Sequence, residues 1–127
     1  MNPIVHFEIL AGPGQDKAKL QQFYARTFDW KIESDNPFAY GMVDPGSSAN
    51  GERGIAGAVD ATEEGPAVVI YIEVDDPQQY LDRAIANGAK LVSPVTVIPG
   101  AVTMAQFRDP SGNLMGIVGS ETPPAEP

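Results

Sequence analysis

The sequence contains no cysteine and only one histidine, His6, among its 127 residues. The absence of thiols excludes disulfide bonds, thiolate metal sites and cysteine nucleophiles. A single imidazole excludes most catalytic zinc and non-haem iron sites, which take two or three histidines from one chain. A Ser-His-Asp triad would have to use His6, close to the amino end. These two absences therefore remove most metal and nucleophile chemistry.

Basic residues are scarce, since 8 Lys and Arg stand against 17 Asp and Glu, which gives a formal charge of −9. Residues 1–64 carry 5 basic and 10 acidic residues, and residues 65–127 carry 3 and 7, so the excess is evenly spread. A negative field of this kind disfavours nucleic acid and anionic membrane surfaces as partners. It tolerates or attracts cationic ligands, and we expect neither nucleic-acid nor membrane binding.

Long apolar runs are also missing, because no stretch approaches the 18 residues of a membrane span. The start, MNPIVHFEIL, lacks the basic region of a signal peptide, so we expect a cytoplasmic protein. The length and the 43% hydrophobic content fit one domain, which we place at residues 1–120. Residues 121–127 contain three Pro and two Glu, and we expect them to form a flexible tail.

The apolar pattern predicts one order of elements twice: a strand, a helix and three further strands. The repeats span about 3–60 and 66–119, and each is too small to bury its own sheet. We therefore predict an α+β fold of two βαβββ repeats, with a curled mixed sheet, helices on its convex face and a concave ligand cavity. The predicted strands are 4–10, 30–33, 38–43, 54–59, 67–74, 90–98, 103–108 and 114–118, and the helices are 15–28 and 77–87.

Strand alternation places possible site residues on shared faces. It puts His6 and Glu8 on one face of the first strand, and Val69, Tyr71 and Glu73 on one face of the strand at 67–74. Two carboxylates and an imidazole in one cavity can perform acid–base chemistry or hold a hard cation such as Mg²⁺ or Mn²⁺. The plainer alternatives are two glutamates in water at the rim of the sheet and a hydrogen-bonded, partly buried histidine.

Aromatic and sulfur-containing residues offer an apolar lining. Phe38, Tyr40 and Met42 alternate on a predicted strand and would share one face, and Met104 can line the same pocket. Phe23 and Phe28, at helical spacing, are expected in the core.

Six segments follow one another along the chain in a characteristic order: VHFEI at 5–9, FYARTFDWKI at 23–32, GIAGA at 54–58, YIEVDDP at 71–77, IPG at 98–100 and FRDPSGNLMGIV at 107–118. No segment is specific alone, but together their order and spacing resemble the vicinal oxygen chelate superfamily, and its small single-domain members in particular. That superfamily includes glyoxalase I, extradiol dioxygenases and bleomycin-binding proteins. The resemblance covers about residues 3–119 and implies the curled sheet and a homodimer.

The resemblance also implies where a metal would be held. Metal-using members carry two His or Gln and two Glu, and the matching positions here are His6, Val69, Gly116 and Tyr40 or a neighbour. Only His6 retains a ligand. We therefore expect no metal and no cofactor, and a ligand-binding face made of His6, Glu8, Tyr40, Val69, Tyr71, Glu73, Met104 and Gly116.

Three functions stay open at this point. The first is a metal-free protein, similar to the bleomycin-binding branch, that binds a small cationic or aromatic molecule. The second is an enzyme of isomerase, lyase or dioxygenase type that uses Glu8, Glu73 and His6 as acid and base or as a rebuilt metal site. The third is a structural or regulatory homodimer without a ligand. The sequence does not identify the ligand or the pathway.

Overall fold

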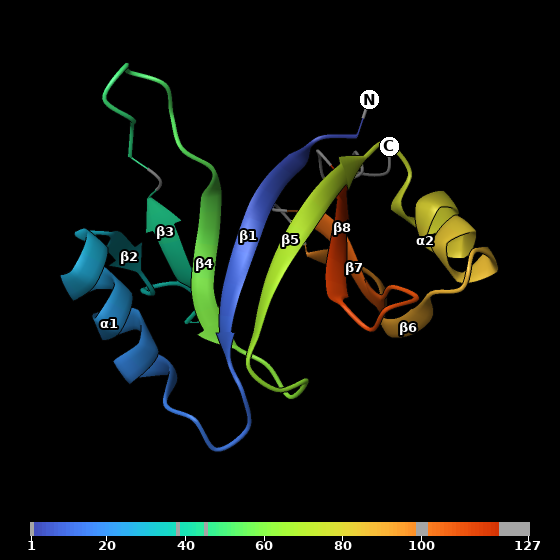
Figure 1. The fold of residues 1–127 in the computed structure, drawn as a ribbon, viewed down its shortest axis with the longest axis horizontal. Coiled ribbons are helices and arrows are strands. Elements are labelled where there is room, and N and C mark those ends of the chain that lie inside the picture. Colours follow the sequence, from blue (N-terminus) through green and yellow to red (C-terminus); the bar gives the residue numbers. More distant parts are fainter. Residues whose placement is uncertain (1, 38, 45, 99–101, 120–127) are drawn as a thin grey trace. The chain divides into compact units, whose positions relative to one another are not determined.

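The computed structural model describes residues 2–37, 39–44, 46–98 and 102–119. They form two compact units, residues 6–69 and residues 70–119 together with 2–5 (Figure 1). The amino-terminal residues join the second unit partly through the Pro3 carbonyl, which accepts a hydrogen bond of 2.8 Å from the Glu73 N–H. Among the described residues, neither helix has the length and apolar character needed to cross a membrane.

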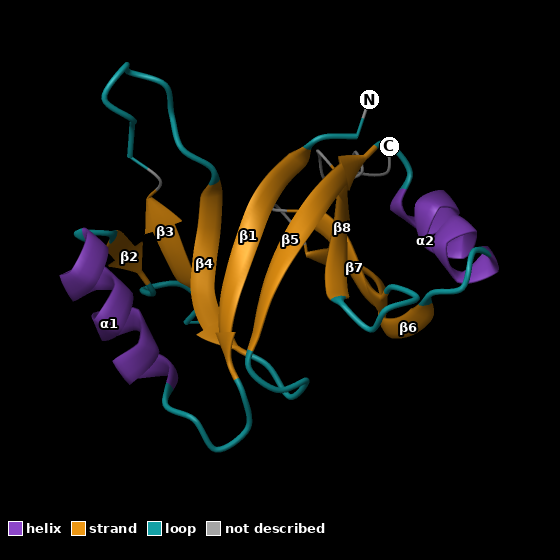
Figure 2. Ribbon diagram, viewed as in Figure 1, coloured by secondary structure: helices purple, strands orange, loops and turns teal. Residues whose placement is uncertain are grey.

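The first repeat has the predicted βαβββ order (Figure 2). Its sheet runs β2-β3-β4-β1. Strands β1 and β4 are parallel, and the other pairs are antiparallel. The elements are β1 (Ile4–Ala11), α1 (Lys17–Phe28), β2 (Lys31–Glu33), β3 (Gly41–Asp44) and β4 (Ala56–Ala61).

The second repeat reproduces this topology, with strand order β6-β7-β8-β5 and one parallel pair, β5 with β8. The predicted α+β class and the two βαβββ repeats are therefore confirmed. The elements are β5 (Ala67–Val74), α2 (Pro77–Ala86), β6 (Lys90–Ile98), β7 (Val102–Arg108) and β8 (Leu114–Gly119).

Both helices begin and end for local reasons. The carboxylates of Asp16 and Asp76 accept hydrogen bonds of 3.1 Å from backbone N–H groups three residues further on, and Pro77 occupies the first turn of α2. Asp29 and Gly88 take left-handed conformations after the two helices, with φ of 58° and 106°. Each helix therefore stops just before a strand.

The two repeats pack their helices differently. In the second repeat, Val74, Leu81, Ala105 and Ile117 are buried together between α2 and the sheet. In the first repeat, α1 has no buried residue, and Phe23 and Phe28 are 54% and 58% exposed. The prediction that these two phenylalanines lie in the core is wrong, because α1 packs through partly buried side chains.

Two predictions about segments need comment. Strand β3 begins at Gly41, so Tyr40 precedes the strand and is not placed by its alternation. Phe38, residues 99–100 of the IPG segment and the predicted tail at 121–127 lie outside the described residues.

Candidate functional site

A hydrogen-bonded cluster in the first repeat brings together three of the predicted residues. The Tyr40 hydroxyl donates a hydrogen bond of 2.8 Å to Oε2 of Glu8. The same hydroxyl lies 2.9 Å from Nε2 of His6. Glu8 is only 6% exposed, so its carboxylate is buried and does not lie in water at the rim of the sheet. A buried carboxylate needs such partners to offset its loss of hydration.

The direction of these bonds fixes the tautomer of His6. A hydroxyl has one hydrogen, and that of Tyr40 is given to Glu8, so Nε2 of His6 must donate to the Tyr40 oxygen. Nδ1 is then the acceptor when the ring is neutral. Burial lowers the pKa of His6 below its ordinary value of 6.5, and the nearby Glu8 carboxylate offsets this only in part. His6 is therefore neutral at pH 7.

Two hydrogen bonds from Asn36 hold the backbone of Tyr40. The side-chain oxygen of Asn36 accepts from the Tyr40 N–H at 2.9 Å, and its amide donates to the Tyr40 carbonyl at 2.7 Å. This Asx arrangement replaces the strand pairing that Tyr40 lacks. The position of Tyr40 is therefore fixed by the Asn36 side chain and not by strand pairing.

The residue before Tyr40 is also constrained. Ala39 has a positive φ of 49°, which is uncommon for alanine. Its carbonyl accepts a hydrogen bond of 3.0 Å from the Lys17 ammonium, which also lies 2.9 Å from Oδ1 of Asp60. The first turn of α1 and strand β4 thus tie down the segment that carries Tyr40. Local strain that surrounding contacts hold in place is frequent at functional sites.

In the second repeat, Tyr71 dominates the face of the sheet that turns away from α2. It is 1% exposed, and Nε2 of Gln106 donates a hydrogen bond of 2.7 Å to its hydroxyl. Its ring lies over Gly116, where a Cβ would overlap the ring carbons. Met104 shares this face because it alternates with Gln106 along β7. Tyr71, Met104 and Gly116 therefore share one face, and their role in lining a ligand site stays a prediction.

Two further predicted residues lie on β5 itself. Val69 is completely buried and apolar. Glu73 is half-buried, and its carboxylate makes no hydrogen bond or ion pair within the described part of the chain. The two glutamates thus differ, since Glu8 has a defined hydrogen-bond partner and Glu73 does not.

The positions that the resemblance implies for metal ligands do not fit a metal ion. The Tyr71 ring occupies the space that a side chain at position 116 would need, and Val69 has no donor atom. Nε2 of His6 is engaged with Tyr40. Within the described ranges, no three His, Asp or Glu side chains lie close enough together to hold an ion. Tyr40, at the fourth position, is likewise bonded to Glu8 and His6.

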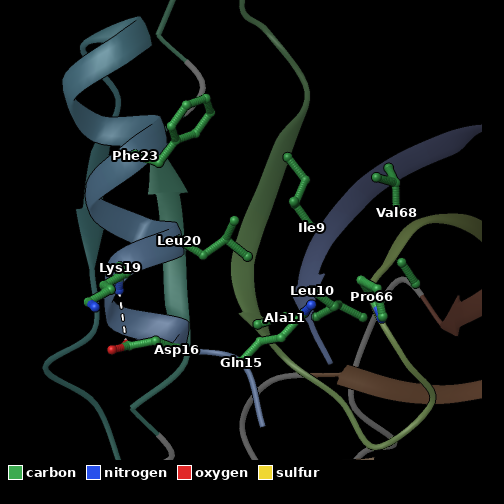
Figure 3. Close-up of a pocket in the computed structure, with 11 residues that line it drawn as sticks. Ile9, Leu10, Ala11, Gln15, Asp16, Lys19, Leu20, Phe23, Pro66 and Val68 are labelled. Atoms are coloured by element: carbon green, nitrogen blue, oxygen red, sulfur yellow. Dashed lines mark hydrogen bonds between the residues drawn. The ribbon is translucent and has the colours of Figure 1, made fainter. Parts of the chain in front are cut away.

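A separate groove of about 790 Å³ opens on the helix side of the first repeat, between β1, α1 and residues 66–68. Figure 3 shows Leu20 of α1 facing Ile9 of β1, whereas the ends of Asp16 and Lys19 point away from the groove. Its walls are mostly apolar, and none of the predicted site residues lines it. We therefore place the site chemistry at the His6–Tyr40–Glu8 cluster and not in this groove.

Sequence reasoning missed Asn36, Lys17 and Ala39, which position Tyr40. The turn-forming segment Ser34-Asp35-Asn36-Pro37 was a visible signal, because Asn commonly bonds to nearby backbone. The ion pair of Lys17 and the positive φ of Ala39 left no such signal.

The sequence is similar to one family of known proteins. A family model described as the Glyoxalase/Bleomycin resistance protein/Dioxygenase superfamily matches residues 4–117. Proteins from Mycobacterium bovis and Mycobacterium tuberculosis, provisionally named glyoxylase CFP32, are 31% identical over 107 residues. That match covers 80% of this chain and 41% of each relative, so the chain spans less than half of their length.

Solved structures share the fold at low sequence identity. A member of the same superfamily from Vibrio splendidus 12B01 is 16% identical with a TM-score of 0.55, over 94% of this chain and 98% of that one. The Mn(II)-bound glyoxalase from Novosphingobium aromaticivorans is 17% identical with a TM-score of 0.54, over 100% of this chain and 42% of that one. At these identities the likeness shows the fold alone.

Proposed function

Because the chain belongs to the Glyoxalase/Bleomycin resistance protein/Dioxygenase superfamily, we propose that it binds a small molecule at the His6–Tyr40–Glu8 cluster without a metal. The observation that carries this proposal is the buried Glu8 carboxylate, which Tyr40 and His6 hold in one hydrogen-bonded chain. Buried polar groups that converge from separate segments are typical of binding sites.

The ligand class follows from charge and aromatic surface. Glu8 supplies a negative charge in a protein of net charge −9, which favours a cation. The rings of His6 and Tyr40 are stacked, with centroids 6.4 Å apart and planes 18° from parallel. Aromatic faces attract both organic cations and other aromatic groups. We therefore propose a small cationic or aromatic ligand. The negative charge and the rings favour a function similar to that of the bleomycin-binding proteins over the binding of an anion.

Isothermal titration calorimetry with bleomycin and a panel of aromatic amines tests the proposal. We expect micromolar binding by at least one probe, and a loss of tenfold or more in Glu8→Gln, because the substitution removes the negative charge. Glu63→Gln is the matched control, since Glu63 is exposed and loses the same charge. Equal affinity in Glu8→Gln and Glu63→Gln, or no binding by any probe, would contradict the proposal.

A second candidate, an isomerase that moves a proton, is favoured by the ordered direction of the same hydrogen bonds. Glu8 would take a proton from a carbon next to a carbonyl and return it to another atom of the substrate, so that no co-reactant is needed. Tyr40 and His6 would position the carboxylate. Glu73 is a weaker candidate base because no hydrogen bond within the described residues orients its carboxylate.

The glyoxylase name of the mycobacterial relatives suggests the first assay. The hemithioacetal of methylglyoxal and glutathione would be offered to the untagged protein with and without added divalent metal. Turnover without metal that Glu8→Gln abolishes and Glu73→Gln preserves would support this candidate. Turnover that survives Glu8→Gln would contradict its site.

The homodimer implied by the resemblance is a separate proposal. We expect a sedimentation mass of two chains, and a mass of one chain at working concentration would contradict it.

A further inference from the structure

The two repeats have corresponding positions at the ends of their helices. Asp29 and Gly88 are both left-handed, and a lysine that begins a strand follows each of them two residues later. Positions 29 and 88 differ by 59 residues, so the same offset relates their neighbours. It pairs Tyr24 with Arg83, Phe28 with Asn87 and Trp30 with Ala89.

In the first repeat these positions form an aromatic cluster at the carboxyl end of α1. The Trp30 ring stacks on Tyr24 at a centroid distance of 5.4 Å and lies 6.0 Å from Phe28. It also reaches Phe7 of β1, at 5.7 Å. Four aromatic rings therefore contact one another beside the helix, although Phe28 stays more than half exposed.

In the second repeat the corresponding residues are an arginine, an asparagine and an alanine. A cavity of about 360 Å³ lies between α2 and the sheet, within residues 2–5 and 70–119. Its floor is apolar and includes Ile72, Val74 and Ile117. Arg83 and Asn87 of α2 stand at its rim. Two of the three positions that are aromatic in the first repeat, those of Tyr24 and Phe28, thus carry Arg83 and Asn87 at the edge of this cavity.

Among the described residues, the charge at the rim contacts an aromatic ring but no acidic group. The Arg83 guanidinium lies over the Tyr80 ring, 4.6 Å from its centroid, and makes no ion pair or hydrogen bond within the described ranges. Its neighbours three and four residues away along the helix include no acidic residue, although the chain carries 17.

The last carbonyl groups of α2 are hydrogen-bonded without the Arg83 side chain. The carbonyls of Arg83, Ala84 and Ile85 accept hydrogen bonds from backbone N–H groups of residues 87–89. The Asn87 amide also donates to the Arg83 carbonyl, at 2.8 Å. The guanidinium is therefore not needed to cap these groups.

We propose that this cavity is a second binding site, which takes a small monocarboxylate with an apolar body. The carboxylate would pair with Arg83, whose planar guanidinium suits bidentate contact with two oxygens. The apolar body would cover Ile72 and Phe107, which are only partly buried. A volume of this size suits a short chain or a single ring. This site is independent of the His6–Tyr40–Glu8 cluster, which lies in the other repeat.

NMR titration of the full, ¹⁵N-labelled chain with hexanoate tests the proposal. We expect saturable shifts in the amides of Tyr80, Arg83 and Asn87, with dissociation at or below about 1 mM, near −4 kcal/mol. Hexanol should bind at least tenfold more weakly because it has no charge to pair with Arg83.

Two variants locate the site. Arg83 is exposed, so Arg83→Gln should not disturb the fold, and it should weaken the binding of hexanoate at least tenfold. Arg26→Gln, the matched change in the last turn of α1, should leave the affinity unchanged. Ala84→Leu, which adds bulk to the lining, should also reduce binding while distant amides keep their positions.

Three results would overturn the proposal. The first is the absence of saturable shifts in the wild-type chain. The second is equal affinity in Arg83→Gln and Arg26→Gln. The third is a wild-type dimer that Arg83→Gln dissociates, since a second copy would then cover the cavity.

Discussion

The Tyr71 ring in β5 covers Gly116 in β8 so closely that a Cβ at position 116 would overlap the ring. The two residues are direct partners in the parallel pair of these strands. The Tyr71 hydroxyl is held at its other end by Gln106. A larger residue at position 116, such as the glutamate that the resemblance implies for metal-using members, would therefore have to displace the ring.

Gly116→Ala should destabilise the protein through this contact. The added methyl group overlaps a ring that is 1% exposed, so we expect the free energy of unfolding to fall by about 1–3 kcal/mol. In a Tyr71→Ala background the same change should cost less than half as much, because the overlapping ring is gone. Urea denaturation of the four proteins measures this coupling, and equal costs in both backgrounds would show that the contact is not responsible.

Tyr40→Phe removes the hydroxyl and keeps the ring, so it tests the contribution of the hydroxyl to stability. The variant loses the hydrogen bonds to the Glu8 carboxylate and to His6, and we expect it to lose about 1–3 kcal/mol of unfolding free energy. Tyr80→Phe is the matched control, since the Tyr80 hydroxyl has no hydrogen bond within the described ranges. A similar loss in both variants would argue against a special role for the Tyr40 hydroxyl.

Stability should depend on pH through His6. Burial lowers the folded pKa of His6 below 6.5, so the unfolded chain binds the proton more readily. This contribution to stability is complete above pH 6.5 and is lost as the pH falls below that value. As the only histidine, His6 gives one pair of ring C–H signals in a proton NMR titration. We expect its midpoint below 6.5, and a midpoint at or above 6.5 would contradict the buried, neutral ring.

The same pH dependence should appear in denaturation curves. Between pH 7.5 and 5, the wild type should lose unfolding free energy relative to His6→Gln, which cannot take up the proton. Parallel curves for the two proteins would remove His6 as the cause.

Metal retention tests the fit of the ligand positions. Untagged protein would be incubated separately with Mn²⁺, Fe²⁺, Ni²⁺ and Zn²⁺, desalted and measured by mass spectrometry. We expect no near-stoichiometric retention, because Val69 and Gly116 offer no donor atoms. Retention that is lost in His6→Ala would show that other residues complete a metal site and would favour the enzyme.

The periodicity of the sequence already predicted most of the fold. Strands β5 and β6 have the predicted bounds, and α2 begins after an acidic cap as predicted, whereas α1 begins at Lys17 and not at residue 15. These features depend on neighbouring residues, through side-chain alternation, capping and the left-handed turn at Gly88, so one chain segment contains enough information. The burial of the aromatic residues of α1 could not be predicted in this way, because helical spacing does not show how closely a sheet approaches the helix.

The sequence by itself determined the α+β repeats, the excess of acidic groups and the loss of metal donors at positions 69 and 116. Only the tertiary structure decided that Glu8 is buried and bonded to Tyr40, whereas Glu73 is not oriented in this way. Alternation assigns a residue to a face but does not fix the distance to a side chain that arrives from another segment. Tyr40 reaches Glu8 because Asn36 and Lys17 hold its backbone from outside the strand, and such contacts depend on the folded chain.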